Sequence, residues 1–311
     1  MQALLDTLAT LPLPTEAQRL FHGRGGLHPG CEHWVLDWFE PVWVLTSFQA
    51  VPEEDLARVG QVLAARWALI APGQALNWVF QCRQENQVET RLMAGSVPAP
   101  HVVSEQGARY AVHVLKGQNH GLFLDMAEGR RWVRARAAAQ PGLRVLNLFA
   151  YTCAFSVAAL QGGAAEVINV DMASGALSIG RRNHELNGLG KAPAGQASYL
   201  AHDIFNSWAK LRRSGPYGLI ILDPPSFQKG SFVATKDYAR LMRRLPELLA
   251  PGGEALLCLN TPKLGTAFLM DQMAELAPSL QFVERLPNPP AFADADPERA
   301  LKVLVYRAPA A

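Results

Sequence analysis

Apolar and polar residues follow two different patterns along the chain, and the pattern changes near residue 144. Beyond it, short apolar runs are separated by amphipathic stretches of helical period, as in repeated βα units. Strands that are apolar along their whole length are typical of a parallel sheet covered by helices on both faces. We therefore expect a Rossmann-like, doubly wound, mostly parallel α/β sheet with strands at 145–149, 167–171, 198–201, 218–223 and 254–260 and helices at 155–160, 173–187, 204–213, 236–249 and 266–276. The late apolar runs 282–285 and 302–306 are expected to add edge strands.

The first third of the chain predicts a smaller α+β domain. Its β-like runs at 42–46 and 76–80 flank a helix that starts at Pro52, has acids in its first turn and runs to about Trp67. Its tryptophans are expected to form a core rather than a binding platform, and we recognise no chemistry in it. Prolines at 98 and 100 mark a link, so we expect domains at 1–99 and 100–311. A role of the first domain in substrate recognition is a hypothesis from its position alone.

The segment after the link predicts a further pair of strands. Residues 109–115 and 121–125 are expected to pair around a turn at 116–120. An arginine-rich helix is expected to follow, before the first strand of the parallel sheet.

Acidic residues stand where three of the predicted parallel strands end. Asp171, Asp203 and Asp223 end or follow the second, third and fourth strands. The carboxyl ends of parallel strands meet at one edge of a sheet, where such folds bind their ligands. We therefore expect the three carboxylates to line one site. The alternative interpretation is that each Asp caps the helix that follows it.

The turn after the first strand indicates which ligand suits this site. Residues 150–155 contain no glycine, whereas a bound pyrophosphate needs the close backbone approach of a glycine-rich turn. A nicotinamide dehydrogenase is therefore disfavoured, and no GxGxxG motif is present. S-Adenosylmethionine fits better, because it has a ribose, an adenine and a cationic sulfonium but no phosphate. Asp171 would accept from the ribose hydroxyls, and Asp203 from the adenine amino group.

The turn after the fourth strand, Asp223-Pro224-Pro225-Ser226-Phe227, is the most specific motif in the chain. Its two prolines fix the backbone and remove two N–H donors, so the strand must stop there. The Asp223 side chain and the turn carbonyls can accept hydrogen bonds from an amino group or a ring edge, and Phe227 can stack on a base. The alternative is a strand-ending turn with a core phenylalanine.

Residues 101–311 resemble class I S-adenosylmethionine-dependent methyltransferases, and more narrowly the bacterial 23S ribosomal RNA methyltransferases of the RlmK and RlmI type. The resemblance is carried by the segments 118–125, 145–152, 170–171, 202–205 and 222–227, and the run 19–26 is also similar. It implies that the cofactor is held by Phe123, Asp125, Asn147, Phe149, Tyr151, Thr152, Asp171, Met172, Asp203, Ile204 and Asp223. The Cys153-Ala154 pair stands where relatives often carry glycines, and its Cβ atoms narrow the turn.

The resemblance also bears on the reacting atom. It implies that the Asp-Pro-Pro turn faces this atom, with Asp223, Pro224, Pro225, Phe227 and Asn260 as the catalytic group. Methylation of a pyrimidine C5 needs a thiolate that attacks C6. The C5-cytosine relatives carry a cysteine where this chain has Asn260, and Cys258 is expected to be an inert core thiol.

Methylation of a nitrogen needs only positioning and orientation of the base. We therefore expect a methyltransferase acting on a base nitrogen in ribosomal RNA. The alternatives are a C5-cytosine RNA methyltransferase and a non-catalytic member of the family that binds cofactor or RNA.

Composition and charge refine the choice of partner. The chain has 311 residues, is 49% hydrophobic and 18% charged, and carries a net charge of +2, which excludes disorder and gives no sign of a strongly basic nucleic-acid binder. The charge is uneven, at −4 over residues 1–100 and +6 over the rest, which suggests that the second part meets an anionic partner. Basic residues that could contact RNA phosphates are Arg130, Arg131, Arg134, Arg136, Lys229, Lys236, Arg240, Arg243 and Arg244, although a solvated helix face is the alternative for each.

The cysteines and the apolar runs predict the compartment. Four scattered cysteines without a CxxC pair give no sign of a zinc site, and no metal is expected. The first residues lack the basic start of a signal peptide, and no apolar run reaches the length of about 18 residues that a membrane span needs. A cytoplasmic protein is expected.

Overall fold

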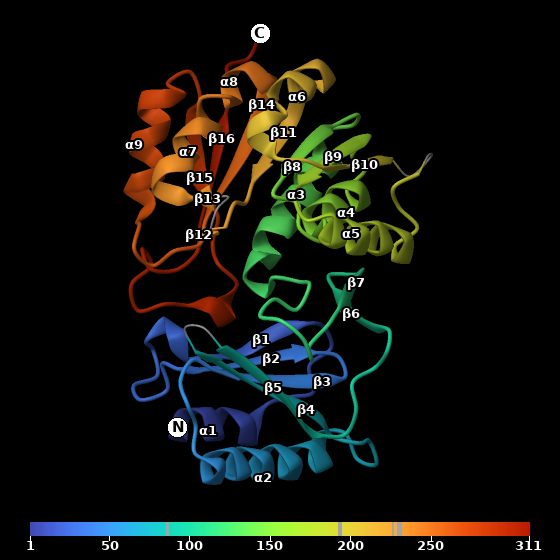
Figure 1. Cartoon of the computed structure of the whole chain (residues 1–311), viewed down its shortest axis with the longest axis vertical. Coiled ribbons are helices and arrows are strands. Elements are labelled where there is room, and N and C mark those ends of the chain that lie inside the picture. Colours follow the sequence, from blue (N-terminus) through green and yellow to red (C-terminus); the bar gives the residue numbers. More distant parts are fainter. Residues whose placement is uncertain (85–86, 192–194, 226, 229–231) are drawn as a thin grey trace. The chain divides into compact units, whose positions relative to one another are not determined.

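A computed structural model describes residues 1–84, 87–191, 195–225, 227–228 and 232–311 of the chain. The chain divides into two compact units, which are considered separately (Figure 1). The first unit comprises Met1–Asp125 and Pro289–Pro297, and the second comprises Met126–Asn288 and Glu298–Ala311. This division differs from the sequence-based boundary at 99/100, because it assigns residues 100–125 and the returning segment Pro289–Pro297 to the first unit.

The second unit is built on a seven-stranded sheet in the order β10-β9-β8-β11-β14-β16-β15. Its first five strands in this order are parallel, and β16 runs antiparallel to both of its neighbours. The doubly wound α/β fold is therefore confirmed. The prediction that 302–306 forms an edge strand is wrong, because β16 is inserted between β14 and β15. The strands are β8 (Arg144–Leu148), β9 (Glu166–Asp171), β10 (Gln196–Ala201), β11 (Tyr217–Leu222), β14 (Leu249–Leu259), β15 (Gln281–Arg285) and β16 (Lys302–Arg307).

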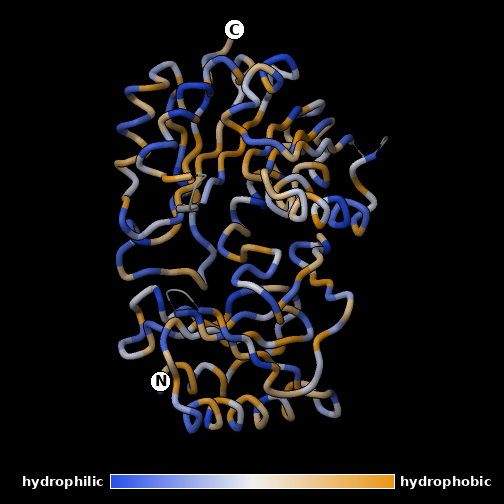
Figure 2. Tube along the Cα trace, in the orientation of Figure 1, coloured by the Kyte–Doolittle hydropathy of each residue, from blue (hydrophilic) through white to orange (hydrophobic). Residues whose placement is uncertain are grey.

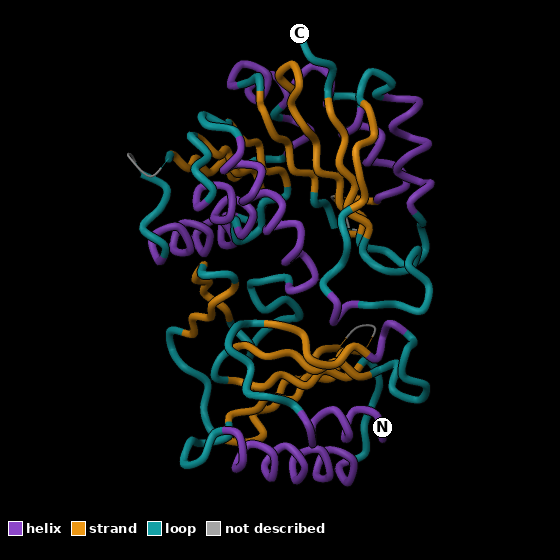
Figure 3. Tube along the Cα trace, turned by 180° about the vertical axis from the view of Figure 1, so that it is seen from behind, coloured by secondary structure: helices purple, strands orange, loops and turns teal. Residues whose placement is uncertain are grey.

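Helices cover both faces of this sheet (Figures 1 and 3). One face carries α3 (Ala127–Ala139), α4 (Ala154–Gln161) and α5 (Ser174–Leu186), and the other carries α6 (Trp208–Ser214), α7 (Ala234–Met242), α8 (Leu245–Leu248) and α9 (Thr266–Leu276). Side chains alternate along each strand, so Val145 packs with α3 and α4 while Leu146 packs with α6 to α9. Because both faces are buried, the central strands are largely apolar, as Figure 2 shows for the middle of the sheet.

Two helices predicted from the sequence are interrupted. The segment 204–213 is a 3₁₀ turn, η3 (Ile204–Asn206), followed by α6, and the segment 236–249 is divided into α7 and α8. Pro246 lies in the first turn of α8 and has no N–H to continue a helix from α7. The boundaries of the other helices in this unit differ from prediction by about a residue, which is the usual scatter at helix ends.

The first unit contains a five-stranded sheet in the order β1-β2-β3-β4-β5, with α1 (Gln2–Thr10) and α2 (Glu53–Ile70) packed on one face. The β3–β4 pair is parallel, since α2 forms the crossover between them, and the other pairs are antiparallel. Its tryptophans, such as Trp38 and Trp43, are at most 5% exposed, which confirms their role in the core. The strands are β1 (Gln18–His22), β2 (Trp34–Phe39), β3 (Val42–Ser47), β4 (Asn77–Gln84) and β5 (Gln87–Ala94).

A separate hairpin corrects the prediction for residues 109–125. Strand β7 (Ala108–Val112) pairs with the preceding β6 (His101–Glu105), and residues 121–125 are not a strand. The turn between them is Gln106-Gly107, with φ of 52° and 77°, which is the left-handed pair that a tight hairpin requires. The remaining short elements are the 3₁₀ turns η1 (Gly23–Gly25), η2 (Leu124–Met126) and η4 (Pro290–Phe292) and the strand pair β12 (Phe227–Gln228) and β13 (Phe232–Val233). Among the described residues, no helix combines the length and apolar character of a membrane span.

A buried carboxylate ties three elements of the second unit together. Glu254 on β14 is 1% exposed and forms ion pairs with Arg136 of α3 and Arg307 of β16. We expect Glu254→Gln to lower the free energy of unfolding by about 3 kcal/mol, because it leaves two partly buried guanidinium groups without their carboxylate. Urea unfolding followed by circular dichroism measures the loss.

The matched control is Glu128→Gln, which removes the exposed ion pair with Arg131. This change is expected to cost less than about 1 kcal/mol, because solvent screens such pairs. Equal losses in the two variants would contradict the structural role of Glu254.

Candidate active site at the carboxyl edge of the second sheet

The predicted residues of the second unit lie at the carboxyl ends of its parallel strands. Phe149 to Thr152 follow β8, Asp171 and Met172 end and follow β9, and Asp203 and Ile204 come after β10. Asp223 and the two prolines follow β11, and Asn260 follows β14. The chain leaves β8 towards β9 on one side and later returns to β11 on the other, so the topological switch lies between β8 and β11. Ligands bind beside such a switch, which is where the loop after β8 begins.

The loop after β8 has an unusual backbone. Phe149, Tyr151 and Cys153 have φ of 58°, 46° and 60°, so three non-glycine residues alternate into the left-handed region. Each such residue costs of order 1 kcal/mol or more, and it persists only where the surroundings fix it. The loop lacks the glycines that relatives often carry, but its backbone is still left-handed at these three residues. The loop adopts conformations that glycine would adopt more easily.

Three hydrogen bonds hold this loop in place. The Asp171 carboxylate accepts from the backbone N–H of Tyr151 at 2.8 Å, and the Asn183 side chain donates to the carbonyl of Thr152 at 2.9 Å. The N–H of Cys153 also donates to the carbonyl of Ala150 at 2.7 Å. Asp171 thus acts on the loop of the neighbouring strand, and its contact with the cofactor stays a prediction. The sequence analysis did not identify Asn183, which is a buried polar residue on α5.

Cys153 fits its position because a glycine faces it. Its side chain is fully buried, and burial raises the pKa of its thiol far above the ordinary value, so it is an inert packing group. A Cβ built on Gly180 of α5 would lie 2.4 Å from the Cys153 sulfur. Cys153 therefore places a side chain in the loop at a position where relatives often have glycine. Gly180 of α5 leaves the space that this side chain occupies.

A buried polar chain lies beneath the loop. Asn147 donates to Asn169 at 2.9 Å, and Asn169 donates to the Ser156 hydroxyl at 3.1 Å. The Ser156 oxygen lies 2.8 Å from Nε2 of His184, and Nδ1 of His184 lies 2.7 Å from the Gly180 carbonyl. Burial lowers the pKa of His184, so the neutral ring donates from Nδ1 and accepts from Ser156 at Nε2. The side chain of Asn147, predicted to bind cofactor, is thus engaged in the sheet interior.

Asp171 and Asp203 both make the local contacts that the capping interpretation expects. Asp171 accepts from the N–H of Ala173 at 2.8 Å in addition to Tyr151. Asp203 accepts from the N–H of Phe205 and from the Asn206 side chain, at 2.9 and 2.7 Å. Each carboxylate oxygen has a second acceptor direction. Both groups are partly exposed and can accept further hydrogen bonds from hydroxyl or amino groups of a ligand.

Apolar groups stand beside these carboxylates. Met172 is 59% exposed directly after Asp171, so its apolar side chain is accessible to a ligand. Phe149 packs edge-on against Phe232, with ring centres 5.4 Å apart, and Phe205 is stacked on Phe232 at 6.5 Å. Ile204 is buried beneath them. The edge of the sheet therefore combines acceptors for polar groups with apolar surface for a flat ring.

The predicted catalytic residues end two adjacent strands. Leu222 of β11 is paired with Leu257 of β14, so Asp223 and Asn260 follow neighbouring parallel strands. Asn260 is exposed, Asp223 is partly exposed, and Pro224 is buried. Ser226 and Lys229 lie outside the described residues, as does the side chain of Phe227, whose backbone belongs to β12. Cys258 is fully buried and its carbonyl accepts from the Tyr238 hydroxyl, which confirms it as a core residue.

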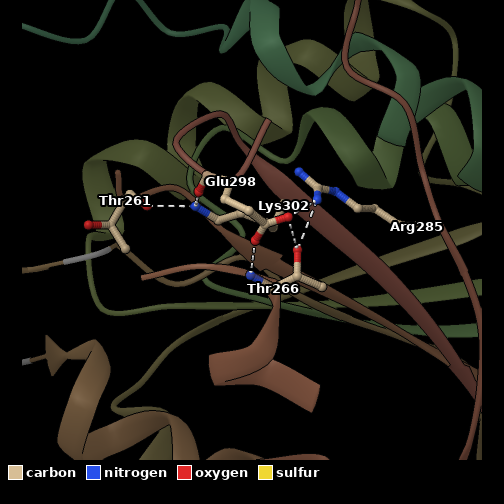
Figure 4. Close-up of polar contacts among 5 residues, drawn as sticks. All are labelled: Thr261, Thr266, Arg285, Glu298 and Lys302. Atoms are coloured by element: carbon tan, nitrogen blue, oxygen red, sulfur yellow. Dashed lines mark hydrogen bonds and ion pairs between the residues drawn. The ribbon is translucent and has the colours of Figure 1, made fainter. Parts of the chain in front are cut away.

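A lysine that the sequence analysis did not single out supports the loop after Asn260 (Figure 4). Lys302 of β16 is 0% exposed, and its ammonium group donates to the carbonyls of Thr261 and Glu298 at 2.6 and 2.9 Å. The Glu298 carboxylate in turn accepts from Thr266 and Arg285. These contacts fix the backbone next to Asn260. A charged residue inside the apolar run 301–306 is the signal that could have identified Lys302.

Four of the predicted RNA-contacting cations form ion pairs within the unit. Arg136 is paired with Glu254, and Arg131, Arg240 and Arg244 are paired with acids one turn away on their own helices or turns. Arg130 is buried, and Lys236 and Arg243 are exposed. The solvated or structural alternative therefore applies to most members of this set, which leaves the RNA contact of the second unit unassigned.

Two predicted cofactor residues belong to the first unit. Phe123 is 39% exposed and Asp125 is partly exposed, and both precede the start of the second unit at Met126. Their contact with cofactor stays a prediction. Among the described residues, no group of three or more His, Cys, Asp or Glu side chains is placed to hold a metal ion.

Comparisons with known proteins agree with this geometry. The profile of a family described as S-adenosylmethionine-dependent methyltransferase matches residues 18–307. The Ribosomal RNA large subunit methyltransferase I of Aeromonas hydrophila is 38% identical over 173 residues, which are 54% of this chain and 42% of that protein. The protein of the same name from Photobacterium profundum is 32% identical over 293 residues, which are 91% of this chain and 71% of that protein.

The solved structures include a similar crystal structure described as a methyltransferase complexed with SAH. It superposes with a TM-score of 0.79 at 25% identity, over 94% of this chain and 75% of that one. The chain therefore spans less than half the length of its Aeromonas relative, but most of this structural neighbour.

The contact between Gly180 and Cys153 generates a stability prediction. We expect Gly180→Ala to lower the free energy of unfolding by about 2 kcal/mol, because the new Cβ overlaps the sulfur. Adding Cys153→Gly removes the overlap and the left-handed strain, so the double variant should recover most of the loss. A double-mutant cycle by urea unfolding measures this coupling.

The control on the same helix is Gly175→Ala, since nothing lies within 4 Å of a Cβ at that position. It should be neutral or stabilising by up to about 1 kcal/mol. Additive effects of the Gly180 and Cys153 changes would show that the two residues are not coupled.

Proposed function

Because the chain belongs to the S-adenosylmethionine-dependent methyltransferase family, we propose that it transfers the cofactor's methyl group to a nitrogen of a base in ribosomal RNA. When bound, the cofactor supplies an electrophilic methyl group on a sulfonium. The residues of this chain bind and orient the two reactants. The observation that carries the proposal is the carboxyl edge of the second sheet, where Asp171 and the left-handed loop after β8 lie on one side of the switch and Asp223 and Asn260 on the other.

The residues present fit the cofactor. Asp171 retains acceptor capacity for a ribose diol, and Asp203 for an exocyclic amino group. Met172 offers exposed apolar surface for the adenine ring. The carboxylates also suit the positive sulfonium, whereas a phosphate would meet uncompensated acids. Asp171 therefore does two things: it holds the Tyr151 backbone in its left-handed form, and it faces the ribose.

The chemistry of the edge favours nitrogen over C5 as the methyl acceptor. C5 methylation needs a thiolate, and both cysteines of the second unit, Cys153 and Cys258, are 0% exposed. The group that follows β14 is the Asn260 amide, which can orient a base edge but cannot add to C6. Asp223 beside it can accept from an amino group of the base. Positioning in line with the methyl group then supplies most of the rate.

Similarity to ribosomal RNA methyltransferases supports RNA as the substrate. Methylation of ribosomal RNA would place the protein in the cytoplasm, where ribosomes are assembled in bacteria. A non-catalytic member of the family is the alternative, and it is disfavoured because the polar residues after β11 and β14 are present at the edge.

The role of Asp171 is tested by cofactor binding. We expect Asp171→Asn to weaken binding of S-adenosylhomocysteine at least about tenfold, because a charge-assisted hydrogen bond of roughly 1.5–3 kcal/mol is lost. Isothermal titration calorimetry measures the change. Glu185→Gln is the control, since it removes the same charge from an exposed position of α5. An absence of binding by the folded wild-type protein would refute the cofactor assignment.

The substrate and the reacting atom are tested together. Nucleosides from ribosomal RNA of a strain that lacks the gene should miss one N-methylated base, and plasmid-borne wild type should restore it. We expect Asn260→Ala and Asp223→Asn to lower the rate of methyl transfer about tenfold or more with little change in cofactor affinity. Mass spectrometry of nucleosides gives the readout. Loss of a C5-methylated cytosine would overturn the choice of nitrogen, and an unchanged pattern would overturn ribosomal RNA as the substrate.

A further inference from the structure

The sheet of the first unit carries a polar cluster on the face that α1 and α2 leave uncovered. Residues at alternate positions of β2, β3 and β4, including Trp38, Trp43 and Phe80, pack towards the helices. The intervening positions point the other way, and among them are Asp37 on β2 and Arg83 on β4. Arg19 on β1 is paired in register with Asp37 and shares its face. A largely apolar sheet thus presents arginines on its second side.

One of these arginines is neutralised. Arg19 donates to both oxygens of Asp37, at 2.8 and 3.1 Å, in a bidentate ion pair. A third nitrogen of Arg19 lies 2.9 Å from Nδ1 of His22. Burial and the Arg19 charge lower the pKa of His22 to about 4, so the ring is neutral at pH 7 and accepts this hydrogen bond. Both carboxylate oxygens of Asp37 therefore accept from Arg19, and the Asp37 charge also acts on the nearby Arg83.

The hydrogen bonds of a second arginine, Arg83, to described residues go to neutral groups. Arg83 donates to the Gln81 side chain and lies 3.3 Å from Nε2 of His120. Gln81 is itself fixed by the Gly117 carbonyl at 2.8 Å. Burial and the neighbouring Arg83 charge lower the pKa of His120 to about 4, so this partner is uncharged as well. No carboxylate among the described residues forms an ion pair with Arg83.

The third arginine has no hydrogen-bond acceptor among the described residues. Arg24 lies in the turn η1, and its guanidinium stacks over the Phe48 ring at 4.1 Å from the ring centre. Arg83 approaches the same ring at 5.8 Å. Part of the Arg24 side chain is exposed to solvent. Desolvation by the surrounding protein and the charge of Arg19 lower the pKa of its guanidinium group. The Phe48 ring thus orients the Arg24 guanidinium group, whose N–H groups donate to no described residue.

We propose that Arg24 and Arg83, which both lie over the Phe48 ring, bind a phosphate group of the RNA backbone. A guanidinium whose plane is fixed by an aromatic ring presents paired N–H groups, which match two oxygens of a phosphodiester. The cluster contains three arginines and two nearby carboxylates. Asp37 is paired with Arg19, and the charge of Asp294, from the returning segment, acts on His22. Positive charge therefore remains in excess at the site, although residues 1–100 as a whole carry a net charge of −4.

The choice of RNA rests on the proposed function, and it gives the first unit a role. Phosphate contacts position a nucleic acid without selecting its sequence. In the second unit, Arg131, Arg136, Arg240 and Arg244 are already paired with acids, which makes these four less available for such contacts. The motif 19–26, which resembles that of related methyltransferases, supplies two of the three arginines. The first unit would thus hold the strand while the second unit carries the cofactor and the reacting residues.

The experiment compares Arg24→Ala with Arg58→Ala, which removes the same charge from an exposed position of α2. Arg24 makes no hydrogen bond among the described residues, and Arg58 makes one exposed hydrogen bond to the Gln2 side chain at 3.3 Å, so neither change should affect folding, and thermal unfolding verifies this. Fluorescence anisotropy measures binding of a short labelled single-stranded RNA of mixed sequence over a range of salt concentrations. A third variant, Arg24→Lys, keeps the charge but loses the planar fork and the stacking.

We expect Arg24→Ala to weaken RNA binding about tenfold and to reduce the salt slope by about 0.7, the value for one phosphate contact on a single strand. Arg24→Lys should recover only part of the affinity, and Arg58→Ala should equal wild type. Binding of S-adenosylhomocysteine should be the same in all four proteins, because the cofactor residues are unchanged.

Equal RNA affinity of the Arg24 and Arg58 variants would overturn the proposal, as would a wild type that binds no RNA. Binding of inorganic phosphate that depends on Arg24, without binding of RNA, would assign the site to a small anion instead. Methyl transfer is not the readout. If the protein shows no methyltransferase activity but binds RNA in a way that depends on Arg24, the proposed function is refuted and the RNA-binding site is supported.

Discussion

The hydrogen bond from the Tyr151 backbone to Asp171 is the contact on which the candidate site depends. It joins the ends of two adjacent parallel strands, and it holds a loop in which three non-glycine residues take left-handed conformations. Such a backbone is unfavourable in isolation and requires outside support. Asn183 supplies more of that support from α5, and Gly180 leaves the space that Cys153 fills. The residue that we propose to bind the ribose is thus also the one that shapes the loop beside it.

The rest of the second unit keeps this edge rigid. Apolar clusters on both faces of the sheet fix the strands, and the buried chain from Asn147 to His184 ties two strands to α4 and α5 with each polar group directed. A fully satisfied network of this kind is stable because every alternative leaves a buried group without a partner. On the other side of the switch, Lys302 fixes the backbone after Asn260 in the same manner. Buried hydrogen bonds of the interior therefore fix the backbone that carries the residues of the candidate site.

The first unit shows how an average charge can mislead. Its acids exceed its bases over residues 1–100, and its sequence suggests no chemistry. The fold nevertheless gathers Arg19, Arg24 and Arg83 from three separate elements, and among the described residues the one carboxylate that forms an ion pair with them binds Arg19. Neutral histidines and an aromatic ring complete the cluster. A local excess of positive charge can therefore arise in an acidic domain, because burial and pairing decide which charges reach a ligand.

The sequence by itself determined the fold class and the edge of the sheet where the site lies. Continuous apolar strands alternating with amphipathic helices are typical of a parallel sheet buried on both faces, and an acid at the end of a strand is a local feature that survives folding. The tertiary structure alone decided the pairing of β6 with β7, the insertion of β16, the support of the loop by Asn183 and Gly180, and the grouping of the arginines. Each of these depends on residues far apart in the chain. Their contacts are set by how strands and helices pack, and the periodicity of a segment carries no information about its distant neighbours.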